Sequence, residues 1–487
     1  MPQSLADHQL RQSVPELSAH RSRLALIPVV AALALLGCGC GGDPAAQSIE
    51  PASRPAPTAT PSPDHSAFVA AIDALAAEAL ERGPIAGLSI AVQARGAEVL
   101  AKGYGFADLE AKIPATADTS YPIASVTKRL TAAAILRLAD QGRLTLDDPL
   151  SRFFPAARPA IGALTLRHLL QHTSGLTRGG PAPRAAAQSV VVRGGTGRPQ
   201  GDDWTYSNYN FSLLGLVLEH VTGRDYAGHV EQELAGPLGL TGTGYCEDGR
   251  AVPGRGKDYL SGPGSLTETA YWTEARFFAS GGLCSTVRDL VRWEKALQDG
   301  RVVSSAMVQA MQSPARLSSG TSVDYGLGTR LGFTGASRKI GHTGGGQGNK
   351  AALARYPGHD VTIVVVLNTE RDDATVTAID IEERVERLFF GSPQATREPD
   401  PSASIWVSGE YRDGRRRLRV RADGGALMLA PGLSGAAESR LLAQDHATFV
   451  AEEDPSLEVR FWDDGGGIRG YRRYRNGWFT GFAMRMD

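Results

Sequence analysis

Strand-like runs stand at both ends of a long segment whose interior is mostly helical. Residues 87–94 (GLSIAVQA) and 99–105 are apolar runs at one end, and residues 351–355 and 361–367 (VTIVVVL) are apolar runs at the other. Between them, apolar residues recur mainly at helical spacing. We therefore predict an α+β fold in which strands from the two ends of the segment share one sheet.

Helical patterns enclose these strands. Helical spacing over residues 65–82 precedes the first strands, and a closing helix is expected over residues 374–390. The main folded body is therefore predicted to span residues 65–390.

The end of the chain has a different pattern. Residues 391–403 form a Pro-containing break that we interpret as a linker. Short alternating runs fill residues 404–487 and predict a small antiparallel β domain. Arginines alternate there with Leu418 and Val420, a pattern that favours a solvated strand face over a phosphate-binding patch.

The N-terminal region has the features of a secretory signal. Residues 24–37 (LALIPVVAALALLG) are uncharged and follow Arg21 and Arg23. Fourteen residues are too few to cross a bilayer core, which needs about 20, but they suit the apolar region of a signal peptide. The run ends at a Leu-Leu-Gly-Cys sequence that resembles a bacterial lipobox, so residues 1–38 are predicted to be a lipoprotein-type signal with lipidation at Cys38. Ordinary signal cleavage is the alternative.

A tether follows this signal. Residues 39–64 are Pro-rich and are expected to form an extended linker. A lipid anchor and a tether predict a protein of the cell envelope, as a periplasm-facing lipoprotein attached to the membrane, or else a secreted protein.

Charge and cysteine content limit the function further. The chain has 51 Lys and Arg against 52 Asp and Glu, so no basic surplus is present for nucleic acid binding. Cys246 and Cys284 are the thiols of the predicted mature body. Outside the cytoplasm they could form a disulfide, and two free buried thiols are the alternative.

Residues 121–150 contain a serine and a lysine three positions apart. Helical spacing begins after Pro122 and ends near Gly142. Ser125 and Lys128 then lie on one face of the first turn, with the hydroxyl at the positive end of the helix and the amine within reach of its proton. This pair is a weak signal alone and needs companion motifs.

Two further motifs accompany this pair. Residues 206–208 (YSN) precede a predicted helix, and residues 342–344 (HTG) precede a predicted strand. Together with residues 125–128 (SVTK), they resemble the serine β-lactamase and penicillin-recognising hydrolase family. The match is to its class C branch, which also holds D-alanyl-D-alanine carboxypeptidases, D-aminopeptidases and β-lactamase-like esterases. The resemblance covers about residues 66–390 and implies a β-lactamase/transpeptidase-like serine hydrolase domain.

The resemblance implies a catalytic role for each motif residue. Ser125 would be the nucleophile that forms an acyl-enzyme, and Lys128 would be its general base, kept neutral by burial. Tyr206 would relay a proton to the leaving group. Asn208 would position Lys128 and the substrate amide.

The third motif is implied to form the substrate-binding edge. His342, Thr343 and Gly344 would line this edge, and the oxyanion hole would use the backbone N–H groups of Ser125 and Gly345. Dedicated β-lactamases of this branch usually carry lysine where His342 stands. Since imidazole has a reference pKa near 6.5 and is mostly neutral at pH 7, a D-Ala-peptide or ester substrate is favoured over a β-lactam.

A second class of function remains open. The domain could be an inactive or slow penicillin-binding-like module that binds cell-wall peptide without turnover. His168 and His172 have helical i, i+4 spacing, but no third ligand is evident, so no metal and no cofactor are expected. The expected partners are a peptide or small-molecule substrate, and the chain is expected to be a monomer.

Overall fold

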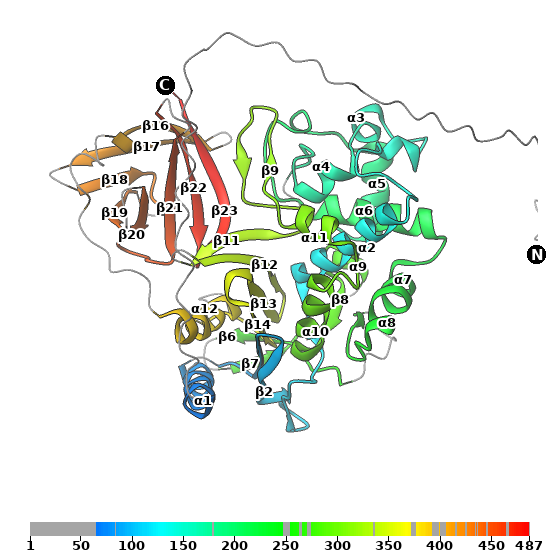
Figure 1. Cartoon of the computed structure of the whole chain (residues 1–487), viewed down its shortest axis with the longest axis vertical. Coiled ribbons are helices and arrows are strands. Elements are labelled where there is room, and N and C mark those ends of the chain that lie inside the picture. Colours follow the sequence, from blue (N-terminus) through cyan, green and yellow to red (C-terminus); the bar gives the residue numbers. More distant parts are fainter. Residues whose placement is uncertain are drawn as a thin grey trace, which may run out of the picture. The chain divides into compact units, whose positions relative to one another are not determined.

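An antiparallel sheet forms the centre of the fold in the computed structural model (Figure 1). Its strands run in the order β11 (Arg330–Thr334), β12 (Ser337–Gly346), β13 (Asn349–Tyr356), β14 (Val361–Leu367), β1 (Gly87–Ala94), β2 (Ala97–Asp108) and β3 (Ile113–Pro114). β1 pairs with β14 from Leu88↔Leu367 to Ala94↔Val361. The prediction that strands from both ends of the body share one sheet is therefore confirmed.

The structure describes residues 65–486 with internal gaps. The gaps are residues 83, 178–179, 247–253, 263–264, 270–273, 335–336, 372–375, 392–398, 400–405, 414–415, 424–425, 434, 436, 445–446 and 464–466. The predicted signal, Cys38 and the linker over 39–64 lie outside the described residues. No helix in the described part of the chain is long and apolar enough to cross a membrane.

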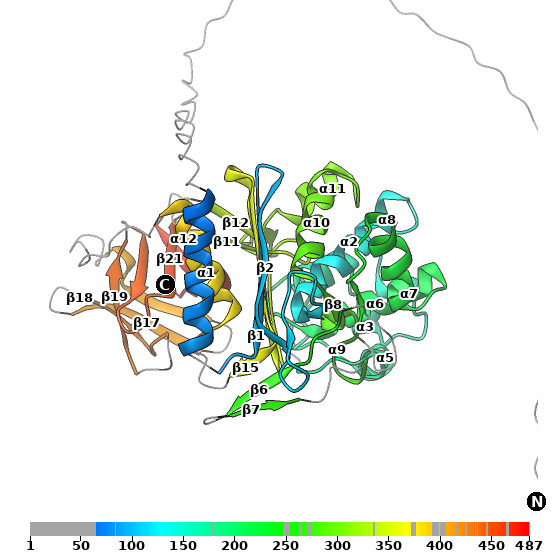
Figure 2. The same ribbon diagram turned by 90° about the horizontal axis from the view of Figure 1, so that it is seen from below.

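The central sheet lies between two layers of helices (Figure 2). Helices α1 (His65–Arg82) and α12 (Ala378–Phe390) cover one face, and the larger helical region covers the other. Along β14, Ile363 and Val365 belong to the core under α1 and α12, whereas Val364 and Val366 belong to the core of the helical region. Side chains of a strand alternate between the two faces, so burial on both faces explains the unbroken apolar run.

The helical region is built from short helices and short strand pairs. Its helical elements are η1 (Ala124–Val126), α2 (Thr127–Asp140), η2 (Leu150–Arg152), α3 (Pro159–Gly162), α4 (Leu166–Gln171), α5 (Arg184–Arg193), α6 (Asn208–Thr222), α7 (Tyr226–His229), the π-helical η3 (Val230–Ala235), α8 (Gly236–Leu238), α9 (Glu274–Gly281), α10 (Val287–Gln298) and α11 (Ser305–Met311). The short strands are β4 (Tyr121–Pro122), β5 (Gly244–Tyr245), β6 (Tyr259–Gly262), β7 (Ser265–Glu268), β8 (Leu283–Ser285), β9 (Ala315–Arg316), β10 (Ser322–Val323) and β15 (Thr369–Arg371), and η4 (Pro357–His359) joins β13 to β14.

Helix α5 lies in a segment whose composition does not suggest a helix. The segment over 178–200 is rich in Gly, Pro and Ala, a composition typical of a surface loop, yet Arg184–Arg193 is helical and follows Pro183. Ala187 and Val191 are buried on its inner side, so tertiary packing selects a helix from a stretch whose composition suggests a loop.

The terminal strands form a closed antiparallel β-barrel region. They are β16 (Gly409–Asp413), β17 (Arg416–Asp423), β18 (Ala426–Ala430), β19 (Ser439–Ala443), β20 (Thr448–Ala451), β21 (Leu457–Asp463), β22 (Ile468–Arg475) and β23 (Trp478–Arg485), and β16 pairs with β23 to close the ring. In β17, Leu418 and Val420 are buried while Arg417 and Arg419 are exposed, which confirms the solvated strand face.

The barrel continues the central sheet. β23 pairs with β11 through Trp478 and Gly332. A side chain on Gly332 would lie 2.1 Å from the carbonyl oxygen of Gly477, so glycine permits this close approach. Behind the pairing, Phe479 packs against Trp204 in an apolar cluster shared by barrel and body. The linker predicted at residues 391–403 stays a prediction. The last strand, β23, packs against the body.

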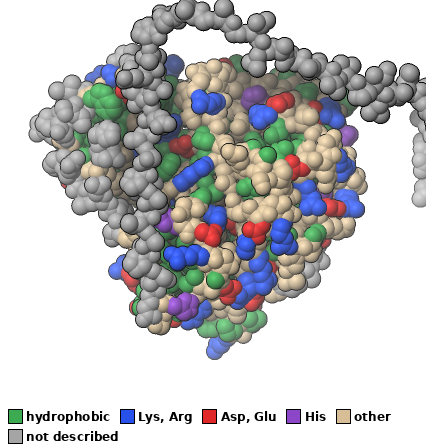
Figure 3. Space-filling model, viewed as in Figure 1, with side chains coloured by type: hydrophobic (Ala, Val, Ile, Leu, Met, Phe, Trp, Pro, Cys, Tyr) green, Lys and Arg blue, Asp and Glu red, His purple; other side chains and the backbone are tan. Residues whose placement is uncertain are grey.

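The outer surface has mixed charge. On the face seen in Figure 1, basic and acidic side chains are interspersed over the described residues (Figure 3). This mixture agrees with the formal net charge of −1.

Candidate active site

Ser125 lies in a tight turn immediately before α2. The 3₁₀ turn Ala124–Val126 leads directly into the helix, and Ala124 has a φ of +45°. The N–H of Ile123 donates to the carbonyl oxygen of Leu283 in β8, so the chain before the turn is fixed to a neighbouring strand. Ser125 is thereby held at the N-terminal end of a long helix, where partial positive charge favours developing negative charge.

Lys128 is completely buried beneath Ser125. Its Nζ lies 3.0 Å from Oγ of Ser125, 2.8 Å from Oδ1 of Asn208 and 2.7 Å from the carbonyl oxygen of Ser280. Burial lowers the pKa of Lys128 from its ordinary value. Tyr206 opposes this shift through its charge and a hydrogen bond, and the Arg330 charge adds a smaller lowering effect. The two carbonyl-type oxygens can only accept, so they match the two N–H groups of a neutral amine and leave its lone pair for the serine hydroxyl.

Tyr206 and Asn208 complete this cluster. Nζ of Lys128 lies 4.9 Å from the centre of the Tyr206 ring. Burial acts to raise the pKa of Tyr206, but the charge of Lys128 when it is protonated, the charge of Arg330, and hydrogen bonds from Lys128 and Ser125 give a net lowering. Nδ2 of Asn208 donates to the carbonyl oxygen of Gly180 at 3.1 Å, which fixes the amide so that its oxygen faces Lys128.

Strand β12 forms the second wall of the site. β11 pairs with β12 only as far as Gly341, so within the described residues no strand pairs with that edge beyond this point. A side chain on Gly344 would lie 2.3 Å from the carbonyl oxygen of Ile123 and 3.1 Å from the Ser125 nitrogen. Glycine therefore lets the strand approach the nucleophile, and the partly exposed Thr343 and the exposed Gly345 follow the same edge.

His342 does not reach the substrate edge, which corrects the role expected for it. Its side chain is completely buried. Nδ1 lies 2.6 Å from the Thr343 carbonyl oxygen and Nε2 lies 3.1 Å from the Tyr325 hydroxyl. Burial, followed by the charges of Arg330 and Lys128, holds the pKa of His342 well below its ordinary value. The ring is therefore a neutral internal support, with both nitrogens occupied.

Arg330 and Ser280 are site residues that the sequence reasoning missed. Arg330 lies 5.3 Å from the centre of the Tyr206 ring, and the Ser280 carbonyl oxygen accepts a hydrogen bond from Lys128. Neither residue belongs to a motif. Arg330 is the first residue of β11, and Ser280 contacts Lys128 only through its backbone carbonyl oxygen. No sequence signal places Arg330 beside Tyr206 or Ser280 beside Lys128.

A cavity of about 360 Å³ opens beside Tyr206. The body contributes Asp203 and Trp204 to its walls, and the barrel contributes Arg473 and Phe482. Both signs of charge and an aromatic surface therefore meet next to the tyrosine. The barrel thus takes part in the surroundings of the catalytic cluster.

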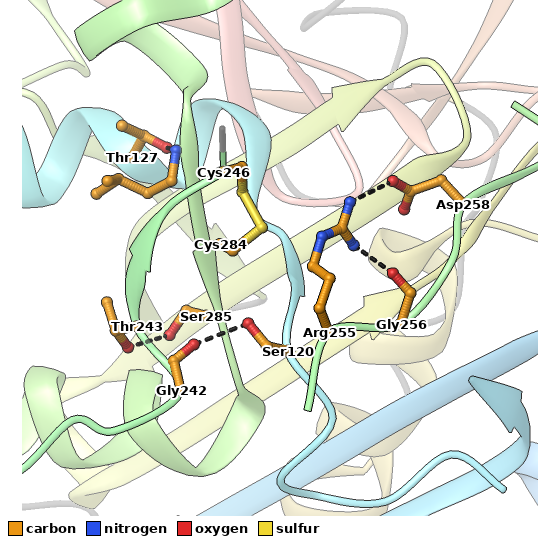
Figure 4. The surroundings of a disulfide bond; sticks show 11 residues. Ser120, Thr127, Gly242, Thr243, Cys246, Arg255, Gly256, Asp258, Cys284 and Ser285 are labelled. Atoms are coloured by element: carbon orange, nitrogen blue, oxygen red, sulfur yellow. Dashed lines mark hydrogen bonds and ion pairs between the residues drawn. A yellow bond between two sulfur atoms is a disulfide. The ribbon is translucent and has the colours of Figure 1, made fainter. Parts of the chain in front are cut away.

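Cys246 and Cys284 form a disulfide (Figure 4). Their Cα atoms are 5.2 Å apart, and the bond links β8 to the end of β5. Pro122 in β4 pairs with Cys284, so the cross-linked strand is also the neighbour of the chain that leads to Ser125. Of the two expected alternatives, the structure therefore has the disulfide and not two free thiols.

His168 and His172 do not converge on a common point. Nδ1 of His168 bonds to the Thr165 hydroxyl, whereas Nδ1 of the buried His172 bonds to the Asn210 side chain and to the Ser207 N–H. Among the described residues, no group of three or more His, Cys, Asp and Glu side chains is arranged to hold a metal ion.

The fold and the site together define a serine-hydrolase-like class of protein. A buried lysine faces a serine at a helix start, a tyrosine and an asparagine adjoin the lysine, and an open strand edge passes the serine. A nucleophile, a base, a proton donor and a backbone wall for an oxyanion are the groups that acyl transfer through a serine requires.

Comparisons with known proteins agree with this class. The β-lactamase family model matches residues 72–386, and the chain belongs to this family. It is 29% identical to penicillin-binding protein 4* of Bacillus subtilis (strain 168) over 317 residues, which cover 60% of this chain and 69% of that protein. It is 34% identical to protein flp of Staphylococcus aureus (strain COL) over 191 residues, which cover 36% of this chain and 38% of flp.

Two solved structures show how far the similarity extends. The D-amino acid amidase from Ochrobactrum anthropi SV3 aligns with a TM-score of 0.56 and 26% identity, covering 67% of this chain and 98% of the amidase. The octameric penicillin-binding protein homologue from Pyrococcus abyssi aligns with a TM-score of 0.59 and 21% identity, covering 85% of this chain and 99% of the homologue. The second likeness concerns the fold alone. The chain is a β-lactamase-family, serine-hydrolase-like or penicillin-binding-like protein.

Proposed function

We propose that this protein is a serine hydrolase that forms an acyl-enzyme on Ser125 from a D-amino-acid-containing peptide, amide or ester. The observation that carries the proposal is the distance of 3.0 Å between Nζ of the buried Lys128 and Oγ of Ser125. A lysine with a lowered pKa can take the serine proton as the hydroxyl attacks the substrate carbonyl.

The remaining steps use the same residues. Negative charge on the carbonyl oxygen is stabilised by the N–H groups of Ser125 and Gly345. The proton taken by Lys128 passes through Tyr206 to the leaving group as the tetrahedral intermediate collapses to the acyl-enzyme. Water then attacks the acyl carbonyl, and Ser125 regains its proton when the acid is released.

The choice of substrate rests on the third motif. A neutral, buried His342 offers no cation to the carboxylate of a β-lactam or of a terminal D-alanine. A substrate laid along the open edge of β12 is held by backbone hydrogen bonds instead, which suits uncharged esters and amides. The likeness to a D-amino acid amidase at 26% identity supports the same substrate class.

A direct comparison of substrates tests this function. Wild type and Ser125→Ala are assayed with p-nitrophenyl butyrate, a D-amino acid amide, a D-Ala-D-Ala peptide and nitrocefin, and both are treated with a fluorophosphonate. We expect turnover of the ester or the amide to exceed that of nitrocefin, and labelling to require Ser125. Labelling without turnover of any substrate would favour a binding module, and labelling of Ser125→Ala would refute the nucleophile.

We further propose that the protein works in the cell envelope as a lipoprotein. The lipobox-like sequence before Cys38 supports lipid attachment. The disulfide between Cys246 and Cys284 supports an oxidising compartment.

A further inference from the structure

Arg330 connects the catalytic cluster to the terminal barrel. It is the first residue of β11, and its guanidinium carbon lies 5.3 Å from the centre of the Tyr206 ring. Its NH1 group donates a 2.8 Å hydrogen bond to the carbonyl oxygen of Phe479 in β23. One side chain therefore spans from the proton-relaying tyrosine to the last strand of the chain.

We propose that Arg330 is a positioning residue for acylation of Ser125, holding a permanent positive charge against Tyr206, and that the barrel fixes this charge in place through Phe479. The inference rests on the proposed serine hydrolase function. It also gives the terminal barrel a role in the reaction, because an arginine side chain has many rotamers and a fixed acceptor selects one of them.

The groups that face Tyr206 come from several elements. They are Lys128 of α2, Arg330 of β11, His342 of β12, His172 at the end of α4, and Tyr325 before β11. Burial keeps the pKa values of both histidines well below their ordinary value, and burial raises that of Tyr325. Lys128 starts the reaction as a neutral base, so among these groups Arg330 supplies the permanent charge.

Arg330 lies on the strand next to the third motif. It pairs with Gly341, the residue directly before His342. The buried His342 supplies no charge, so the cation of this region stands on β11 and not on the motif. This cation faces the tyrosine ring and is anchored to the barrel.

A fixed positive charge at this point favours the deprotonated forms of its neighbours. The Arg330 charge helps to lower the pKa of Lys128, where burial is the main cause and Tyr206 acts in the opposite direction, and it helps to lower the pKa of Tyr206 against burial. Without it, Lys128 would retain its proton to higher pH, and a smaller fraction of the enzyme could accept the serine proton at neutral pH. The acid limb of the pH–rate profile should therefore move to higher pH.

The experiment measures the rate at which a fluorophosphonate labels the full-length protein between pH 6 and 10. The variants are Arg330→Gln, which loses the charge, Arg330→Lys, which keeps it, and Arg460→Gln as a matched control. The guanidinium carbon of Arg460 also lies over an aromatic ring at the junction of barrel and body, 5.1 Å from the centre of the Phe333 ring. This arginine does not face Tyr206. Melting temperatures establish that each variant is folded.

We expect the acid limb of Arg330→Gln to move up by about one pH unit, with labelling about tenfold slower at neutral pH. The acid limb of Arg330→Lys should lie near the pH of the wild-type limb, and the acid limb of Arg460→Gln should not differ from that of wild type. An unmoved limb in folded Arg330→Gln overturns the inference while the proposed function stands. If that variant does not fold, Arg330→Met carries the same comparison. Wild type that shows no Ser125-dependent labelling would instead contradict the proposed function.

Discussion

The ammonium group of Lys339 lies 4.8 Å from the centre of the Trp478 ring, so the last barrel strand covers a buried charge of the central sheet. Lys339 is completely buried and bonds to Glu382 at 2.6 Å and to Glu386 at 3.1 Å, both in α12. Burial opposes its charge, but the two carboxylates raise the pKa of Lys339 overall. The barrel therefore completes the enclosure of an ion cluster that ties the sheet to α12.

Removing this cover should weaken the whole fold. Trp478→Ala is expected to lower the free energy of unfolding by about 3–5 kcal/mol, because it empties a buried aromatic site and opens the ion cluster to water. Trp406→Ala is the control, since Trp406 is 37% exposed. Urea denaturation measures both variants. Equal, small losses would mean that the barrel contributes little to the stability of the body.

The base assignment predicts a specific kinetic defect. Lys128→Ala should slow acylation by at least about 10²-fold, the usual scale for a lost general base. Single-turnover labelling measures the rate, and circular dichroism checks the fold. Lys295→Ala is the matched control, because Lys295 forms an exposed ion pair with Asp299. An acylation rate near that of wild type in Lys128→Ala would assign the proton transfer to another group.

Patterns local in the chain were predictable from the sequence, and groups assembled by the fold were not. β1 and β14 were found with their observed bounds because a strand buried on both faces must be continuously apolar. Ser125 and Lys128 were identified because their spacing near a predicted helix start coincided with two companion motifs, although Ser125 lies in the 3₁₀ turn before α2. Arg330 was missed, since only the pairing of β11 with both β12 and the barrel brings it to Tyr206.

Burial accounts for the remaining error. The sequence identifies His342 but does not show that its ring is fully enclosed and bonded at both nitrogens. The reference pKa near 6.5 applies to a solvated imidazole, so the sequence does not show that burial holds the pKa of His342 well below this value.

The disulfide should stabilise the support of the nucleophile. Cys246 and Cys284 are 38 residues apart, and constraining a loop of this length in the unfolded chain contributes about 4 kcal/mol. Cys246→Ala/Cys284→Ala should therefore melt at a lower temperature than wild type. Reductant should lower the melting temperature of wild type but not that of the double variant. Identical melting of all samples would show that the bond carries no stability.

Lipid attachment gives a prediction about location. Cys38→Ser should move the protein from the membrane fraction to the soluble fraction, because the lipidated cysteine would be its hydrophobic attachment after signal cleavage. Cys40→Ser is the matched control and should leave fractionation unchanged. Immunoblotting of the separated fractions measures the distribution. Retention of Cys38→Ser in the membrane fraction would point to an uncleaved signal helix or to contacts with other proteins.

The environment of His342 predicts how substrate preference depends on pH. Its folded-state pKa lies well below the ordinary value near 6.5, so the imidazole is already neutral at pH 6 and gains no charge on the way to pH 8. The ratio of kcat/KM for nitrocefin, which carries a carboxylate, to that for p-nitrophenyl butyrate, which does not, should therefore stay level across this range. His342→Lys should not raise the ratio at pH 8 by more than about twofold, because burial and the Arg330 charge would oppose a second buried cation and keep the new amine neutral. His359→Gln is the control, since His359 bonds to Ser337 outside the site. A wild-type ratio that falls as pH rises through 6.5, and a His342→Lys ratio that rises severalfold, would show that position 342 supplies a charge to the substrate carboxylate.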